Sequence, residues 1–536
     1  MTTEEFPVTW EDPSDPDLSW EWDDMHTPGI LTPLAGDYSR IISEGITYRF
    51  ERFGVPIRFR CRIINGYAFF AEQVLAPESD MPRIREEAQA SRRAQARAVR
   101  GYWDQKVFPA LQQTYAWMRE APIETDSPRA VAALWEEVWT RARWLWGLHF
   151  MTNAGSYQAV NELADLYESF VEGAHPGEAL SLVQGLPNDL QRTQRDLFVL
   201  AEKARALPAV ADLIKRDPVA ALAAMPETEG GAEFLEALGS FLDAHGHLGQ
   251  PFDDLTYPSW ADDPTLVLGE VRKRLAARGE DPELLRQQQR ARAETLAAQV
   301  RERLRERPED LKRFEEILAL ALDVGPLTEG HNYWLDRMLQ AYLHRFAVRI
   351  GRRLVEEGAL AASAHVFFLH AEEISAALRN RENLRPLIAQ RRAEHQRWRG
   401  VRPPRYLGRP PEAPSQPNRF EPPPREQTDE KVLRGIGASP GVVRGQVRVA
   451  LSPDDFERVG AGDVLVCPSS NPSWVPLFGI IAGLVTNTGG ALSHAAVVAR
   501  EFGVPAVVGT AEATRRLRDG QLVEVDGTAG EVRMLG

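Results

Sequence analysis

The chain has 536 residues, 43% hydrophobic and 26% charged, and its formal net charge is −14 at pH 7. This length exceeds what one hydrophobic core supports, so two or three domains are expected, and the acidic balance argues against a nucleic-acid partner, which would need a basic face. The chain has two cysteines, no apolar run near 18 residues and an acidic N-terminus without a secretory signal. We therefore expect a soluble cytoplasmic protein with no disulfide framework and no membrane contact.

The first 80 residues are predicted to be an irregular, β-containing segment packed on the helical domain that follows. Closely spaced prolines between Asp12 and Leu34 keep its beginning irregular. The run Ile57–Ile64 predicts a strand, and Asn65-Gly66 after it is a typical two-residue hairpin turn.

Residues 81–400 are predicted to form a mainly helical domain. Apolar residues recur every three or four positions between Pro and Gly breaks, over the segments 84–120, 128–151, 155–174, 187–206, 231–245, 264–304, 308–323, 331–357 and 371–397. The aromatic helix from Trp135 to Phe150 either packs in the core or lines a ligand pocket between helices.

Two polar clusters in this helical region could carry chemistry. The first contains His245 and His247, whose spacing places them on different sides of a helix. The second contains His331, Asp336, Arg337, Arg345 and Arg349, and its α-helical spacing puts His331 and Asp336 on different faces. Buried salt bridges and helix caps would explain most of these residues. Alternatively, histidines and arginines around a cleft could activate a hydroxyl and neutralise a phosphoryl group. We predict no metal site.

Residues 401–430 are predicted to be a linker, because Pro403-Pro404, Pro410-Pro411 and Pro422-Pro423-Pro424 exclude a helix. About thirty extended residues span several tens of ångströms. Such a segment is either an inert spacer or a tether on which the C-terminal domain moves.

Residues 431–536 are predicted to form a small α/β domain. Short apolar runs predict strands at Val442–Ala450, Val464–Cys467, Gly483–Thr486, Ala506–Val508, Leu522–Val525 and Val532–Leu535, and helices are expected at Ser493–Phe502 and Ala511–Leu517. The fold class is therefore α+β and multidomain, with a large, mainly helical N-terminal domain and this small C-terminal α/β domain.

The most informative motif runs from Thr486 to Arg500. A β-branched run leads into Gly489-Gly490, and Ser493 then precedes His494 at the start of a helical pattern that ends at Gly503. An imidazole at a helix N-terminus lies beside free amide N–H groups and the positive end of the helix dipole, which favour an anion. A histidine that carries a phosphoryl group needs this environment.

Residues 433–536 resemble the swivelling phosphohistidine domain of the phosphoenolpyruvate-utilising enzyme family. The motifs Gly435–Gly441, Gly462–Val466, Thr488–Arg500, Asp519-Gly520 and Val525–Gly527 carry the resemblance. It implies that His494 is the catalytic phosphate carrier and that Thr488, Gly489, Gly490 and Ser493 surround its phosphate. The helical region more loosely resembles the substrate-binding domain of rifampin phosphotransferases.

The resemblance implies a phosphotransferase that moves a phosphoryl group on His494 from a nucleotide to a hydroxyl of a small, largely apolar organic substrate, either as the end product or as activation for dehydration. No ATP-grasp domain is recognisable, so ATP and Mg²⁺ are expected only on a separate ATP-grasp subunit, with no cofactor bound by this chain. Two alternatives stay open: a dehydratase or cyclase that uses His494 as an acid/base without nucleotide, and a non-catalytic regulatory partner protein.

Overall fold

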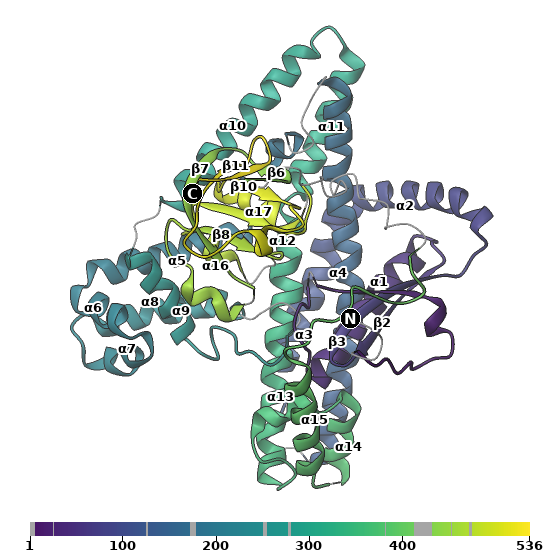
Figure 1. Ribbon diagram of the computed structural model, residues 1–536, viewed down its shortest axis with the longest axis vertical. Helices are drawn as coiled ribbons and strands as arrows, with labels where there is room; N and C mark the ends of the chain where they lie inside the picture. The colour runs from purple at the N-terminus through teal and green to yellow at the C-terminus, as the bar shows by residue number, and fades with distance from the viewer. Residues whose placement is uncertain are drawn as a thin grey trace. The chain divides into compact units, whose positions relative to one another are not determined.

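The computed structural model describes residues 6–24, 26–124, 127–171, 178–249, 254–276, 280–380, 382–411, 431–451, 453–470, 474–491 and 493–535. It divides into two compact units (Figure 1). Unit 1 comprises Met1–Gln158, Phe252–Pro258 and His331–Pro414, and unit 2 comprises Ala159–Pro251, Ser259–Gly330 and Ser415–Gly536. The expected helical domain 81–400 is thus shared between the two units, and the C-terminal α/β domain belongs to the same unit as the middle of the chain.

Unit 1 contains an antiparallel four-stranded sheet with the order β2-β3-β1-β4. Its strands are β1 (Ser19–Trp22), β2 (Ile57–Ile64), β3 (Tyr67–Val74) and β4 (Tyr406–Gly408). The β2–β3 turn confirms the predicted hairpin, because Asn65 and Gly66 both have positive φ, 51° and 84°, as a type I′ turn requires. Residues 406–408 differ from the expected linker, since they pair with β1. The linker residues 412–430 lie outside the described residues.

Helix α1 (Pro33–Arg52) packs on β2, and the prediction of an irregular beginning missed it. Pro33 occupies the first turn of the helix, where no intrahelical N–H bond is lost, so it starts α1 rather than breaking it. Gly36 lets the helix approach the sheet closely, because a Cβ there would lie 2.9 Å from the Ile63 side chain.

The remaining helices of unit 1 largely match the predicted segments. They are α2 (Met81–Tyr102), α3 (Phe108–Glu120), α4 (Pro128–Phe170), α13 (Met338–Glu356), α14 (Ala371–Asn380) and α15 (Arg385–Trp398), with the 3₁₀ turn η7 (Ser363–Phe368). Helix α4 runs unbroken for 43 residues, where two segments were predicted, and it passes from unit 1 into unit 2. Two stretches are π-helical: η3 (Trp103–Val107) and η6 (Asn332–Arg337), which follows the short helix α12 (Leu327–His331).

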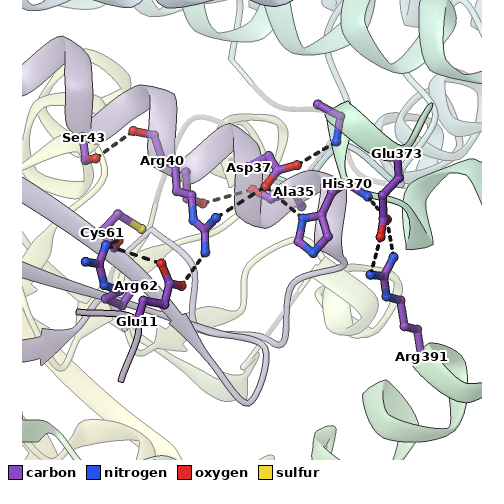
Figure 2. Close-up of polar contacts among 12 residues, drawn as sticks. Glu11, Ala35, Asp37, Arg40, Ser43, Cys61, Arg62, His370, Glu373 and Arg391 are labelled. Carbon is purple, nitrogen blue, oxygen red and sulfur yellow. Dashed lines mark hydrogen bonds and ion pairs between the residues drawn. The ribbon is translucent and has the colours of Figure 1, made fainter. Parts of the chain in front are cut away.

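A chain of ion pairs ties the N-terminal residues to these helices (Figure 2). Glu11 pairs with Arg40 of α1 at 2.6 Å and with Arg62 of β2 at 3.6 Å. One turn earlier on α1, Asp37 contacts His370 at 3.0 Å and accepts a hydrogen bond from the backbone N–H of Ala371. These contacts hold α1, the sheet and the start of α14 together within unit 1.

The helical part of unit 2 surrounds a separate core. Its elements are η4 (Ala179–Val183), α5 (Asp189–Ala206), α6 (Pro208–Arg216), α7 (Pro218–Ala224), η5 (Met225–Glu227), α8 (Gly231–His245), α9 (Thr265–Ala276), α10 (Pro282–Arg303) and α11 (Pro308–Val324). Helices α5 to α9 gather around Phe234, Phe241 and Trp260. Helices α10 and α11 form a hairpin that is joined by the Arg301–Glu315 ion pair.

The C-terminal part of unit 2 is built on an eight-stranded sheet with the order β5-β12-β11-β7-β8-β9-β10-β6. The strands are β5 (Val432–Arg434), β6 (Ile436–Ser439), β7 (Val442–Val449), β8 (Val464–Cys467), β9 (Gly483–Thr486), β10 (Ala506–Val508), β11 (Leu522–Asp526) and β12 (Glu531–Met534). Strands β7 to β10 are parallel neighbours. The sequence predicted the bounds of β8, β9 and β10 correctly.

Both faces of this sheet are buried. Leu465, Leu484 and Val508 face one core, which they share with α16 (Val475–Phe478) and α17 (His494–Phe502). The alternate residues of the same strands, such as Val464 and Val485, face a second core with α18 (Ala513–Arg516). The fold is thus the expected combination of a large helical region with a small C-terminal α/β domain. In the described part of the chain no helix has the length and apolarity that crossing a membrane requires.

Candidate functional site

The candidate site lies where β9 ends and α17 begins. Gly489 has φ 110°, and a Cβ there would lie 2.8 Å from the Ser493 hydroxyl oxygen. A Cβ on Gly509, after β10, would lie 2.8 Å from the Gly489 carbonyl oxygen. The turn is therefore too tight for a side chain at either position, which explains why glycine occupies both.

Ser493 caps helix α17 and thereby fixes His494 as its first residue. The Ser493 hydroxyl accepts a hydrogen bond from the Ala496 backbone N–H at 3.4 Å and lies 2.8 Å from the Gly490 carbonyl oxygen, to which it donates. The imidazole of His494 consequently lies at the positive end of α17, as the sequence predicted.

Two of the predicted phosphate-binding hydroxyls are engaged with the backbone. The Thr488 side chain donates to the Pro468 carbonyl oxygen at 3.1 Å, and Ser493 donates to Gly490. In this arrangement both hydroxyls hold the loop in shape. A phosphate contact from the Ser493 side chain would require its hydroxyl hydrogen to turn away from Gly490.

The ring of His494 faces a carboxylate within unit 2. Its Nδ1 atom lies 3.2 Å from Oε2 of Glu329 on α12, and the two side chains are 14% and 6% exposed. Among the described residues neither ring nitrogen makes a hydrogen bond. The imidazole is therefore enclosed by a polar contact, with both nitrogens still available for chemistry.

Side chains of the helical part hold the far end of α17. The Gln289 amide on α10 donates to the carbonyl oxygens of Arg500 and Glu501 at 2.7 Å and 2.8 Å, and the Gln191 amide on α5 donates to the Glu501 carboxyl group. Arg274 on α9 donates to the Pro476 carbonyl oxygen at 3.2 Å. The C-terminal α/β domain is thus docked on α5 and α10 through the end of α17 remote from His494, and on α9 through α16 (Val475–Phe478).

Two charged residues near the end of α17 have structural roles. Arg500 is buried and donates to the carbonyl oxygens of Ala438 and Ala491 at 2.8 Å and 2.5 Å, so its guanidinium group is engaged within the domain. The pKa of Glu501 is raised to about 8, mainly by burial and also by the nearby carboxylate of Glu329, whereas Arg500 and Gln191 lower it.

His245 and His247 lie in unit 2 on and after the last residue of α8. His245 is fully buried; its Nε2 atom is 2.9 Å from the Asp196 carboxylate and its Nδ1 atom is 3.1 Å from the Thr193 hydroxyl. Burial lowers the pKa of His245, while Asp196 opposes this shift. Both nitrogens therefore join α8 to α5, and His247 is also buried.

His331 and Asp336 meet at one side chain, contrary to the prediction that they lie on different faces. The ring centroid of His331 is 4.6 Å from that of His149 on α4, and Asp336 Oδ1 is 2.6 Å from His149 Nδ1. The reason is that residues 332–337 are π-helical, so the five-residue spacing returns to the same face, which an α-helix would not allow. Burial lowers the pKa of His149 to about 3, which favours the neutral imidazole in this contact.

The arginines of the second cluster have separate surroundings. Arg349 donates to the Glu124 carboxylate and to the Ala121 carbonyl oxygen, both at distances of 2.7 Å or less. Arg345 lies over the Tyr342 ring at 5.9 Å, and Arg337 is buried. An open cavity of about 680 Å³ lies elsewhere in unit 1, between α1, β2 and α4. Trp144 of the aromatic helix lines it, but no residue of the two polar clusters or of the glycine turn does.

Sequence reasoning missed the contacts that Glu329 and Gln289 make with α17, and the role of Glu501 on α17 in docking the domain. Each is an ordinary polar residue of a helical pattern, and the partners on α10, α12 and α17 are far apart in the chain. Spacing within one sequence contains no signal for such contacts.

Two known families match the chain. Residues 459–530 match the "PEP-utilising enzyme, mobile domain" family, and residues 149–327 match the "Rifampicin phosphotransferase fourth domain" family. The first match contains β8 to β11, the glycine turn and His494. The second contains most of α4 and the helical part of unit 2.

Several known proteins are similar. Chondramide synthase cmdD of Chondromyces crocatus is 32% identical over all of this chain and 14% of its own length. The uncharacterized phosphotransferase YvkC of Bacillus subtilis (strain 168) is 28% identical over 70% of this chain and 45% of its own length. Rifampicin phosphotransferase of Streptomyces sviceus is 33% identical over 63% of this chain and 40% of its own length. The chain thus spans less than half the length of each of these three relatives.

Proposed function

We propose, since the chain belongs to the phosphoenolpyruvate-utilising enzyme family through its mobile domain, that it is the carrier and acceptor part of a phosphotransferase. His494 takes a phosphoryl group from a nucleotide and passes it to a hydroxyl of a small, largely apolar organic substrate. The observation that carries the proposal is His494 at the first position of α17, behind a glycine turn in which Gly489 has no room for a side chain.

The geometry of the turn suits a phosphorylated histidine. A phosphoryl group on the ring would lie close to the first turn of α17, whose amide N–H groups have no intrahelical carbonyl partners and whose dipole favours negative charge. The glycines allow the backbone of residues 489–490 to approach the phosphate. Phosphoryl transfer depends mainly on positioning and charge neutralisation, which such a site supplies.

The nucleotide is proposed to bind elsewhere. The chain contains no glycine-rich loop followed by Lys-Ser or Lys-Thr, so ATP and Mg²⁺ are assigned to an ATP-grasp subunit or domain that is separate from residues 1–536. In the first half-reaction a ring nitrogen of His494 attacks the phosphorus, and the bond to the nucleotide oxygen breaks. In the second, the substrate hydroxyl attacks the same phosphorus, and the bond to the ring nitrogen breaks.

The acceptor is proposed from the relatives. The name rifampicin phosphotransferase indicates an organic acceptor, and chondramide synthase contains a block similar to the whole chain within a longer protein. Both support an organic natural product or its precursor as the substrate class. Phosphorylation is then either the end product or the activation of a hydroxyl for elimination.

The experiment is a labelling reaction with the purified chain, radiolabelled ATP, Mg²⁺ and a candidate ATP-grasp protein. We expect label that is stable to base, labile to acid and absent from His494→Ala. His26→Gln, in which an exposed histidine of unit 1 is replaced, is the matched control and should be labelled normally. Unchanged labelling of His494→Ala would refute the proposal.

A further inference from the structure

The imidazole of His494 has a carboxylate neighbour on α12. Glu329 is nearly buried, and its Oε2 atom lies 3.2 Å from His494 Nδ1, an ion-pair distance. Nothing in the phosphate-binding turn supplies this carboxylate, since Glu329 belongs to the helical part of unit 2. Its position therefore needs an explanation beyond the folding of the α/β domain.

A carboxylate beside one imidazole nitrogen has two chemical effects. It favours a proton on that nitrogen, which fixes the tautomer and leaves the opposite nitrogen as the nucleophile. It also stabilises the protonated, cationic form of the ring, because an opposite charge within about 4–6 Å raises the pKa of a histidine.

We propose that Glu329 is a positioning residue of the carrier site. Its carboxylate lies on the Nδ1 side of the ring, accepts a hydrogen bond from the Nδ1 proton when the phosphoryl group is bound, and so directs that group to Nε2. This inference rests on the proposed function, because it assigns a role to Glu329 in the phosphoryl transfer from His494.

The proton on Nδ1 makes the ring a better leaving group. The acceptor oxygen forms its bond to phosphorus, the phosphorus–Nε2 bond breaks, and its electron pair returns to the ring. Because Nδ1 already holds a proton, the ring leaves as neutral imidazole rather than as an anion, and the hydroxyl proton of the acceptor is released to water. Without Glu329 no carboxylate holds that proton, and transfer slows.

The other described charged side chains of this region are either engaged in contacts of their own or, in the case of Glu501, have a raised pKa. Glu329 is therefore the carboxylate that acts on His494. Glu501 on α17 has a raised pKa and Arg500 on the same helix is hydrogen-bonded to carbonyl oxygens. On the elements packed against this region, Arg286 of α10 pairs with Glu283, and Asp189 of α5 pairs with Arg192 at 2.8 Å.

The test compares phosphorylated wild-type protein with phosphorylated Glu329→Gln. Both are labelled with ATP and the partner, separated from nucleotide, and followed for loss of label to water or acceptor between pH 5 and 9. We expect the pH at which the rate falls by half to be at least one unit lower in E329Q, so that its label is lost at least tenfold more slowly at pH 8. Glu329→Asp retains the carboxylate and should restore part of the wild-type pH profile.

The controls separate this inference from the proposed function. Glu302→Gln, an exposed glutamate on α10, should leave the pH profile unchanged. If wild-type and E329Q lose label with the same pH dependence, the inference is wrong while the carrier role of His494 stands. If wild-type protein never becomes labelled on His494, the proposed function itself fails. If the pH profile of E329D is shifted as far as that of E329Q, the loss of packing and not the loss of the carboxylate causes the shift, and the inference is also overturned.

Discussion

Glu501 makes the stability of unit 2 depend on pH in a direction that can be tested. Its carboxyl group receives a hydrogen bond from Gln191 at the junction of the α/β domain with the helical part. Its pKa is raised from 4.5 to about 8, mainly by burial and in part by Glu329. Between pH 4.5 and about 8, Glu501 is therefore protonated in the folded, docked unit and ionised in the unfolded or undocked chain.

Because the folded unit binds this extra proton, its stability decreases as the pH rises. Stability contributed by the neutral carboxyl is fully present below pH 4.5, decreases as the pH rises to about 8, and is constant above that. One pKa unit corresponds to about 1.4 kcal/mol, so the full shift would be worth roughly 5 kcal/mol. Glu501 is only partly shielded from water, which screens the effect, so we expect about half of this, roughly 2–3 kcal/mol, across the window.

The measurement is hydrogen exchange of the α10 and α17 amides in wild-type and Glu501→Gln protein, compared at the same pH. The variant keeps the shape of the side chain and cannot ionise. We expect equal protection near pH 5 and greater protection of the variant at pH 8, by a factor approaching one hundred. Glu457→Gln, at an exposed position of the same domain, is the control. A difference between wild-type and E501Q that is constant from pH 5 to 9 would refute the reasoning.

Three further substitutions test the packing. Gly489→Ala forces a side chain into a positive-φ turn and should cost about 1–3 kcal/mol and reduce His494 labelling, whereas Gly239→Ala, with open space around it in α8, should be neutral or stabilising. Arg500→Met leaves two buried carbonyl oxygens without donors and should cost about 2–4 kcal/mol. Asp336→Ala removes the partner of buried His149 and should lower the thermal midpoint of unit 1 by several degrees. Thermal unfolding followed by circular dichroism checks all three, and an unchanged midpoint for Arg500→Met or Asp336→Ala would contradict the assigned contact.

The C-terminal domain could be predicted closely because its signals are local. Strands β8, β9 and β10 are short apolar runs bounded by glycine, proline or polar residues, and α17 begins immediately after a Ser cap and ends at Gly503, whose φ is 63°. The position of His494 at the helix start follows from the same few residues.

Other features depend on contacts that local patterns do not contain. Strand β4 forms only because residues near 407 meet β1 near residue 20, and its three residues look like part of a proline-rich linker. Helix α1 was not predicted because Pro33 was interpreted as a helix break, although proline is equally common at the first position of a helix. The π-helical stretch η6, which brings His331 and Asp336 to His149, has no spacing signal in a pattern built on 3.6 residues per turn.

The bonds that Gln289 makes to the last carbonyl groups of α17 have a consequence for movement. Carbonyl oxygens at a helix end are readily hydrated, so water can replace the amide of Gln289. His494 is at the opposite end of that helix and takes no part in these bonds. The contacts that dock the domain are therefore separate from the histidine that we propose as phosphate carrier, and undocking would leave its phosphorus–nitrogen bond intact.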